Sequence, residues 1–166
     1  SDLTKGEAVV VTDVGQHQMM AARYYQYNKT KSNVTSCGLG TMGFALPAAI
    51  GAKFGAPEKP VVAIIGDGGF QMTLQELGTI LQSKVDVKII ILNNRFLGMV
   101  RQWQQMFFKK RYSFTNMISP DFIALAKSYS IEGEKVEAGT DLKKALQTML
   151  NHQGAYLLEV MVAKEE

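Results

Sequence analysis

The residues best suited to chemistry in this sequence are an aspartate between glycines and a pair of asparagines. Gly66-Asp67-Gly68 follows an apolar run at residues 60–65, and Asn93-Asn94 follows another at 87–92, with 24 residues between the two motifs. If both runs are parallel strands, their carboxyl ends emerge at one edge of the sheet, so Asp67 and Asn94 face each other. Carboxylate and amide oxygens suit Mg²⁺, which usually shares its coordination with substrate phosphates. The spacing therefore predicts a magnesium–diphosphate site.

A carboxylate by itself repels phosphate, and a divalent cation between Asp67 and the phosphate removes this conflict. A neutral Asn94 as the second side-chain ligand avoids adding negative charge to a site that already holds a diphosphate. The glycines let the backbone approach the ligand, and the next helix offers its N-terminal N–H groups to phosphate oxygens. The alternative is that each motif is only a turn, with Asp67 as a helix cap. The joint spacing on two strong strands favours the metal site.

A second glycine motif, Gly38-Leu39-Gly40-Thr41-Met42-Gly43, matches the dinucleotide-binding pattern G-x-G-x-x-G. In that interpretation the chain is a nicotinamide-binding Rossmann domain, with Asp67 as the ribose ligand. The run before the motif, residues 33–36, is short and polar, whereas the first strand of a Rossmann domain is normally strongly apolar. Asp67 also lies farther downstream than the roughly 20 residues expected of a ribose ligand. The dinucleotide interpretation leaves Asn93-Asn94 unexplained.

The elements that must position these motifs alternate between strand and helix. Near-continuous apolar runs predict buried strands at residues 8–12, 60–65, 87–92 and 155–162, with weaker strands at 33–36 and 134–138. Helical patterns lie between them, at residues 15–25, 41–55, 73–84, 98–108, 119–129 and 140–152. Ser119 is the predicted N-cap of the fifth helix, with Pro120 at its first position. The alternation predicts a doubly wound, mostly parallel α/β sheet with helices on both faces.

Composition limits the classes of protein to consider. The 166 residues suit one domain, and a net charge of +3 gives little reason to expect nucleic acid as a partner. The basic run Lys109-Lys110-Arg111 is interpreted as a solvated helix end. No apolar run reaches the roughly 20 residues that span a bilayer, so no membrane partner is expected. Cys37 is the single cysteine, which favours a reducing compartment and, for Cys37 itself, the role of a small apolar filler.

Four separated blocks carry a resemblance to a known family. They are "VGQHQM" (14–19), "GLGTMGFALPAAIGA" (38–52), "GDGGFQMTLQEL" (66–77) and "LNNRFLGMVRQWQ" (92–104). Together they resemble the catalytic subunit of acetolactate synthase, also called acetohydroxyacid synthase. The resemblance covers nearly the whole chain, but only the family's C-terminal thiamine diphosphate (ThDP) domain. It implies that residues 1–166 are a single ThDP- and Mg²⁺-binding domain, an excised C-terminal part of a longer multidomain enzyme.

The resemblance also implies roles for individual residues. Asp67, Asn94 and the backbone carbonyl of Phe96 would bind Mg²⁺. The further cofactor-binding residues would be Gly15, Gln16, His17, Gly40, Met42, Gly66, Gly68, Gly69, Leu97 and Gly98. In the family, Gly40 and Met42 hold the aminopyrimidine ring, and the methionine side chain keeps the cofactor bent. Met99, Val100 and Trp103 share a helical face and would line the substrate pocket; packing in the core is the alternative.

The family's reaction condenses pyruvate with a second 2-oxo acid, pyruvate or 2-oxobutyrate, with loss of CO2, in branched-chain amino acid biosynthesis. No catalytic residue is expected in this chain, since the family's activating glutamate lies in an N-terminal domain and FAD is bound by another. The expected assembly is a cytoplasmic homodimer or homotetramer, with or without a regulatory small subunit. The nearest alternative is the same domain of another ThDP enzyme, a 2-oxo acid decarboxylase or glyoxylate carboligase; "GMVRQWQ" argues against it.

Overall fold

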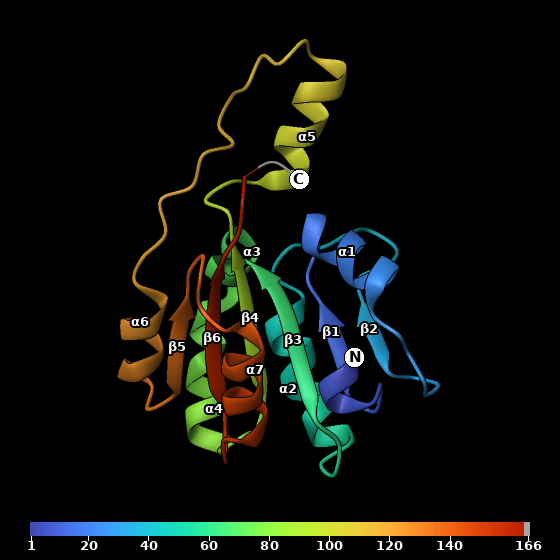
Figure 1. Cartoon of the computed structure of the whole chain (residues 1–166), viewed down its shortest axis with the longest axis vertical. Coiled ribbons are helices and arrows are strands. Elements are labelled where there is room, and N and C mark those ends of the chain that lie inside the picture. The colour runs from blue at the N-terminus through green and yellow to red at the C-terminus, as the bar shows by residue number, and fades with distance from the viewer. Residues whose placement is uncertain (165–166) are drawn as a thin grey trace.

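A computed structural model describes residues 1–164 as a six-stranded sheet with helices on both faces (Figure 1). The strand order is β2-β1-β3-β4-β6-β5, and every neighbouring pair is parallel. The predicted doubly wound sheet is therefore confirmed. The strands are β1 (Val9–Thr12), β2 (Asn33–Thr35), β3 (Val61–Gly66), β4 (Lys88–Asn93), β5 (Glu132–Val136) and β6 (Tyr156–Met161).

Strands β4 and β6 supply alternate side chains to two hydrophobic layers. Residues such as Ala63, Ile65 and Ile91 face the larger layer, which is covered by α2 (Ala45–Gly55), α4 (Leu77–Ser83) and α6 (Phe122–Ser128). Leu158 faces the smaller layer under α7 (Leu142–Asn151). The remaining elements are η1 (Asp2–Thr4), α1 (Gln16–Tyr24), α3 (Asp67–Thr73), η2 (Leu74–Glu76) and α5 (Gly98–Phe107). Two covered faces explain why the central strands read as continuous apolar runs.

Three local predictions were wrong. The single helix expected at residues 73–84 is a 3-10 turn, η2, followed by α4, and Thr73, with φ −136° and ψ 20°, separates this pair from α3. The helix expected from Ser119 begins at Phe122, because Asp121 is the N-cap and accepts hydrogen bonds from two backbone N–H groups. Cys37 is exposed, so it does not fill a gap in the core.

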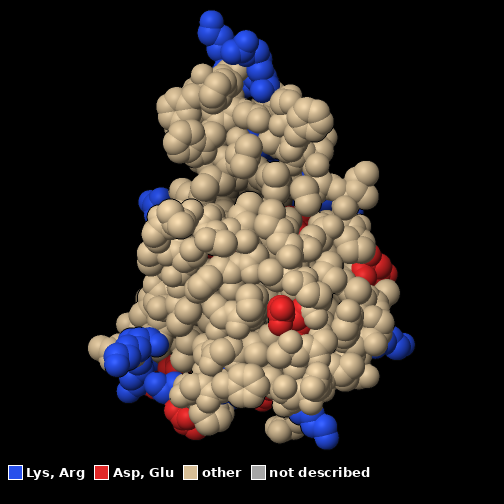
Figure 2. All heavy atoms as spheres, turned by 180° about the vertical axis from the view of Figure 1, so that it is seen from behind, with Lys and Arg blue, Asp and Glu red and all other residues tan. Residues whose placement is uncertain are grey.

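Helix α5 and the segment that returns from it stand out from the body of the molecule (Figure 1). None of the residues of α5 is buried, and large apolar side chains such as Trp103 and Met106 are exposed. Figure 2 shows this projection as a largely uncharged surface with basic side chains at its tip, where residues 109–111 turn back. Within residues 1–164, no helix has the length and apolar character needed to cross a bilayer.

Candidate functional site

A cavity of about 140 Å³ lies where strands β3 and β4 end. The two strands are adjacent and parallel, with Gly66 paired to Leu92, so Asp67 and Asn94 leave the sheet side by side. The predicted meeting of the two motifs at one sheet edge is confirmed. The lining residues are Val14, Gly15, Gln16, His17, Met20, Met42, Gly66, Asp67, Gly68, Gly69, Leu92, Asn94, Phe96, Leu97, Gly98, Met99, Val100, Val162 and Ala163.

Asp67 is the buried carboxylate of this cavity, with only 1% of its surface exposed. Burial raises the pKa of its carboxyl group, and the nearby charge of Glu159 acts in the same direction. Hydrogen bonds from Ser119 and from the backbone of Asp67 and Gly68 oppose this rise in pKa. Ser119 Oγ donates to Asp67 Oδ2 at 3.2 Å. A buried carboxylate whose pKa stays raised despite these hydrogen bonds suits a bound cation, which would offset the cost of burying the charge.

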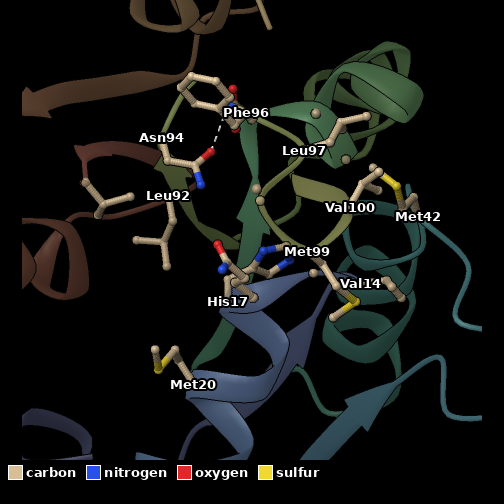
Figure 3. A pocket seen from close by; sticks show the side chains of 18 of the residues that line it. Val14, His17, Met20, Met42, Leu92, Asn94, Phe96, Leu97, Met99 and Val100 are labelled. Carbon is tan, nitrogen blue, oxygen red and sulfur yellow. Dashed lines mark hydrogen bonds between the residues drawn. The ribbon is translucent and has the colours of Figure 1, made fainter. Parts of the chain in front are cut away.

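Asn94 and Phe96 form the second half of the cavity's polar edge (Figure 3). The Phe96 backbone N–H donates to Asn94 Oδ1 at 2.9 Å, which fixes the amide oxygen and leaves it a second lone pair. The neighbouring Asn93 donates through Nδ2 to Glu159 Oε1 at 2.7 Å and so faces the sheet. Among residues 1–164, no three His, Cys, Asp or Glu side chains are grouped to hold a metal ion. A cation here would need amide and carbonyl oxygens in addition to Asp67.

His17 contributes an unpartnered polar atom to the cavity. Its Nε2 is buried and has no hydrogen-bond partner. Burial lowers the pKa of the imidazole from 6.5 to about 4, although the charge and backbone of Asp13 act in the opposite direction. The ring is therefore neutral near pH 7. His17 is part of the cavity lining, and a buried nitrogen there without a partner is suited to meet a polar group of a ligand.

The glycines around the cavity are in close contact with polar side chains. A Cβ atom on Gly98 would collide with Gln16 Oε1 and lie 2.9 Å from Asn94 Nδ2. A Cβ atom on Gly66 would lie 3.0 Å from His17 Cε1. Side chains at these positions would displace the polar groups that line the cavity. The glycines and the orphaned His17 nitrogen together fit a diphosphate with its cation.

Asp13 is a buried residue of this region that the sequence analysis missed. Its Oδ1 accepts from the backbone N–H of Val14 at 2.8 Å and of Gly43 at 3.0 Å, and its Oδ2 accepts from Ala45 N at 3.0 Å. The carboxylate thereby ties the end of β1 to the loop that carries Met42 at the cavity. A Cβ atom on Gly69 would lie 2.7 Å from Asp13 Oδ1, so this glycine makes room for the carboxylate. The sequence feature that could have pointed to Asp13 is its position as a carboxylate directly after a predicted buried strand.

The structure places most of the sequence-predicted residues in the cavity lining, but not all of them. Gly40 and Trp103 are absent from the lining formed by the described residues. Gly40 has φ +61°, and a Cβ atom there would be 3.7 Å from Val14, which does line the cavity. Trp103 packs against Phe107 on exposed α5, with ring centroids 5.2 Å apart and ring planes tilted by 49°. Their cofactor and substrate roles stay predictions.

Sequence reasoning also missed some apolar lining residues. Met20 comes from α1, Leu92 from β4, and Val162 directly follows β6. Val162 reaches the site because its N–H donates to the Asn93 carbonyl at 3.0 Å, which continues the pairing of β6 with β4. Figure 3 shows Met42, Met99 and Val100 on one side of the cavity and Leu92, Asn94 and Phe96 on the other, with His17 between them.

Comparisons with known proteins agree with this geometry. The C-terminal TPP binding domain of the thiamine pyrophosphate enzymes matches residues 13–160. The chain is 48% identical over 167 residues to the acetolactate synthase isozyme 2 large subunit of Escherichia coli, covering 100% of this chain and 30% of the relative. It is 49% identical to the acetolactate synthase large subunit of Cyanidium caldarium, covering 96% of this chain and 28% of that relative. It is also 49% identical to the mitochondrial acetolactate synthase of Schizosaccharomyces pombe, covering 98% of this chain and 24% of that relative. The chain thus spans less than a third of the length of these relatives.

Proposed function

The chain belongs to the thiamine pyrophosphate enzyme family as its C-terminal TPP-binding domain, and we propose that the cavity between β3 and β4 holds the Mg²⁺–diphosphate end of the cofactor. The observation that carries this proposal is the pairing of buried Asp67 with the Asn94–Phe96 turn in one cavity. These groups offer three hard oxygens of the kinds that Mg²⁺ accepts, and the diphosphate would supply others. Nicotinamide binding is not favoured, because it gives Asn94 no role.

The chain's own residues would divide the work of holding the cofactor. Asp67, Asn94 and the Phe96 carbonyl bind the cation. Gln16 and backbone groups at the cavity's glycines meet the phosphate oxygens. His17 borders the same end of the ligand; because the neutral ring donates its Nδ1 proton to the backbone of Asp13, its Nε2 would accept a hydrogen bond there. When bound, ThDP supplies a thiazolium carbon that acts as an electron sink for 2-oxo acid chemistry.

Apolar groups would serve the reacting end of the same ligand. Met42, Gly40 and Val14 would lie toward the ring end, where Met42 would support the bent cofactor. Met99 and Val100 line the cavity, and they and Trp103 would contact the 2-oxo acid. These apolar side chains exclude water, which strengthens the polar contacts at the diphosphate.

We further infer that this domain belongs to the catalytic subunit of an acetolactate synthase, because the similarity in sequence to acetolactate synthase large subunits extends through the whole domain. The complete enzyme would condense pyruvate with a second 2-oxo acid and release CO2, as a cytoplasmic homodimer or homotetramer. The "large subunit" in the names of the relatives supports a small-subunit partner. The activating glutamate and FAD would belong to domains outside residues 1–166. The chain alone should therefore form negligible acetolactate, and measurable turnover by the purified chain would contradict this.

Calorimetric titration of the full-length protein tests the cofactor site. ThDP should bind in the presence of Mg²⁺ and lose most of its affinity when Mg²⁺ is omitted or when Asp67 is replaced by alanine. Asp2→Ala, which removes an exposed carboxylate on η1, is the matched control and should bind like the wild type. Binding of NADH without metal, or full ThDP affinity in Asp67→Ala, would refute the proposed site.

A further inference from the structure

The segment that returns from α5 crosses the metal-site edge of the sheet before it enters α6. Residues 115–119 of this segment, here called the strap, pair antiparallel with the loop after Asn94 through a bridge between Phe96 and Asn116. Leu97 N donates to the Thr115 carbonyl at 2.8 Å, and Met117 N donates to the Arg95 carbonyl at 2.8 Å. The strap therefore holds the loop that carries one half of the proposed cation site.

The geometry of the bridge leaves Phe96 available to the cavity. The two bridging hydrogen bonds use the backbone of Arg95 and Leu97, so the Phe96 carbonyl stands outside the bridge. The Phe96 N–H is directed instead to Asn94 Oδ1. The strap thus fixes the loop's position without using the carbonyl that the cation would need.

The strap also reaches the other half of the site. Ser119 Oγ donates to Asp67 Oδ2 at 3.2 Å, from a residue 52 positions away in the chain. Met117 Cε lies 3.6 Å from the position of a Cβ atom on Gly68, so the strap packs against the start of α3. Ser119 does not cap α6, since Asp121 performs that role. Its hydroxyl is therefore committed to the Asp67 carboxylate rather than to a helix end.

We propose that Ser119 is a positioning residue for the cation: by donating to Oδ2 it fixes the rotation of the Asp67 carboxylate and presents Oδ1 to a cation shared with Asn94 and the Phe96 carbonyl. This inference rests on the proposed function of the cavity. The backbone of Asp67 and Gly68 also bonds to this carboxylate, and Ser119 adds a side-chain contact that further limits its rotation about the Cβ–Cγ bond. A less restricted carboxylate must be ordered when the metal binds, which weakens binding. Hydrogen-bond partners of metal-ligating groups typically contribute 10–100-fold to metal affinity. We expect the lower part of that range, because Ser119 supplies one hydrogen bond of ordinary length.

The test compares Ser119→Thr with Ser119→Val in the full-length protein. These two side chains have nearly the same shape, and only threonine keeps the hydroxyl. Mn²⁺ replaces Mg²⁺ as the probe, and its affinity is measured by electron paramagnetic resonance in the presence of saturating ThDP. Ser119→Val should weaken Mn²⁺ binding about 10-fold, whereas Ser119→Thr should stay within about 2-fold of the wild type. Ser128→Ala, which removes a hydroxyl that donates to the Leu125 carbonyl in α6, should change nothing.

Asp67→Ala, measured in the same way, separates the two proposals. If Asp67→Ala abolishes Mn²⁺ binding while Ser119→Val and Ser119→Thr bind equally well, the positioning role is wrong and the metal site stands. If Asp67→Ala binds Mn²⁺ like the wild type, the metal site itself is wrong and both proposals fall. Melting temperatures provide a further check: an affinity loss in Ser119→Val at an unchanged melting temperature supports positioning. If both Ser119 variants lose Mn²⁺ affinity and both melt at a lower temperature, the loss comes from unfolding of the strap, and the positioning role is wrong.

Discussion

Replacing Asp13 by alanine should destabilise the protein far more than removing a carboxylate with similar hydrogen bonds at the surface. Asp13 is fully buried and accepts three backbone hydrogen bonds, from Val14, Gly43 and Ala45. Gly43 and Ala45 are themselves buried, so water cannot replace the lost acceptor at their N–H groups. Asp121 accepts two backbone hydrogen bonds, from Ile123 and Ala124, but it is exposed. Asp121→Ala is therefore a suitable control: it removes a carboxylate that also accepts backbone hydrogen bonds, but at an exposed rather than a buried position.

The expected magnitude follows from the number of buried donors. Each buried N–H group left without a partner costs about 1–3 kcal/mol, so Gly43 and Ala45 together predict a loss of about 2–6 kcal/mol in the free energy of unfolding. Removing an exposed N-cap such as Asp121 costs about 1 kcal/mol. Asp13→Asn keeps one carbonyl acceptor but turns an amide N–H₂ toward a backbone donor, so its loss should lie between these two values.

Urea unfolding of the chain measures these differences. Far-UV circular dichroism is the suitable signal, because the single tryptophan, Trp103, lies exposed on α5 and reports poorly on the core. The free energy of unfolding should fall in the order wild type, Asp121→Ala, Asp13→Asn, Asp13→Ala, at similar dependence on urea. A loss for Asp13→Ala no larger than that for Asp121→Ala would show that Asp13 does not secure the Met42 loop.

Two further predictions concern the titrating groups of the cavity. Burial raises the pKa of Asp67 above its value in the unfolded chain, so the folded state loses stability as the pH rises from the unfolded to the folded pKa. Asp67→Asn should therefore raise the melting temperature of the metal-free protein at pH 7, with a smaller gain at low pH. No gain at pH 7 would contradict the raised pKa. Burial lowers the pKa of His17 to about 4, so its contribution to stability is present above pH 6.5 and is lost as pH falls toward 4. His17→Gln should flatten the plot of melting temperature against pH between these two values. An unchanged slope would count against a buried neutral His17.

Local pattern was sufficient to predict the sheet and the centre of the site. Continuous apolar runs predict strands that are buried on both faces, and parallel strands bring their carboxyl ends to one edge of the sheet. The sequence was therefore enough to place Asp67 and Asn94 next to each other. The residues that depend on contacts between distant segments could not be found in this way. Ser119 resembled a helix N-cap because serine before proline commonly caps, yet its hydroxyl bonds to Asp67 across 52 residues.

The sequence by itself determined which elements form and which two motifs meet, since apolar periodicity and strand polarity are local properties of the chain. Only the tertiary structure decided how the meeting point is built: that Asp13 holds the Met42 loop, that His17 Nε2 is buried without a partner, and that the strap bonds to both sides of the site. The physical reason is that hydrogen bonds to buried polar groups depend on where distant backbone donors come to lie. Spacing along the chain does not encode those positions in a readable form.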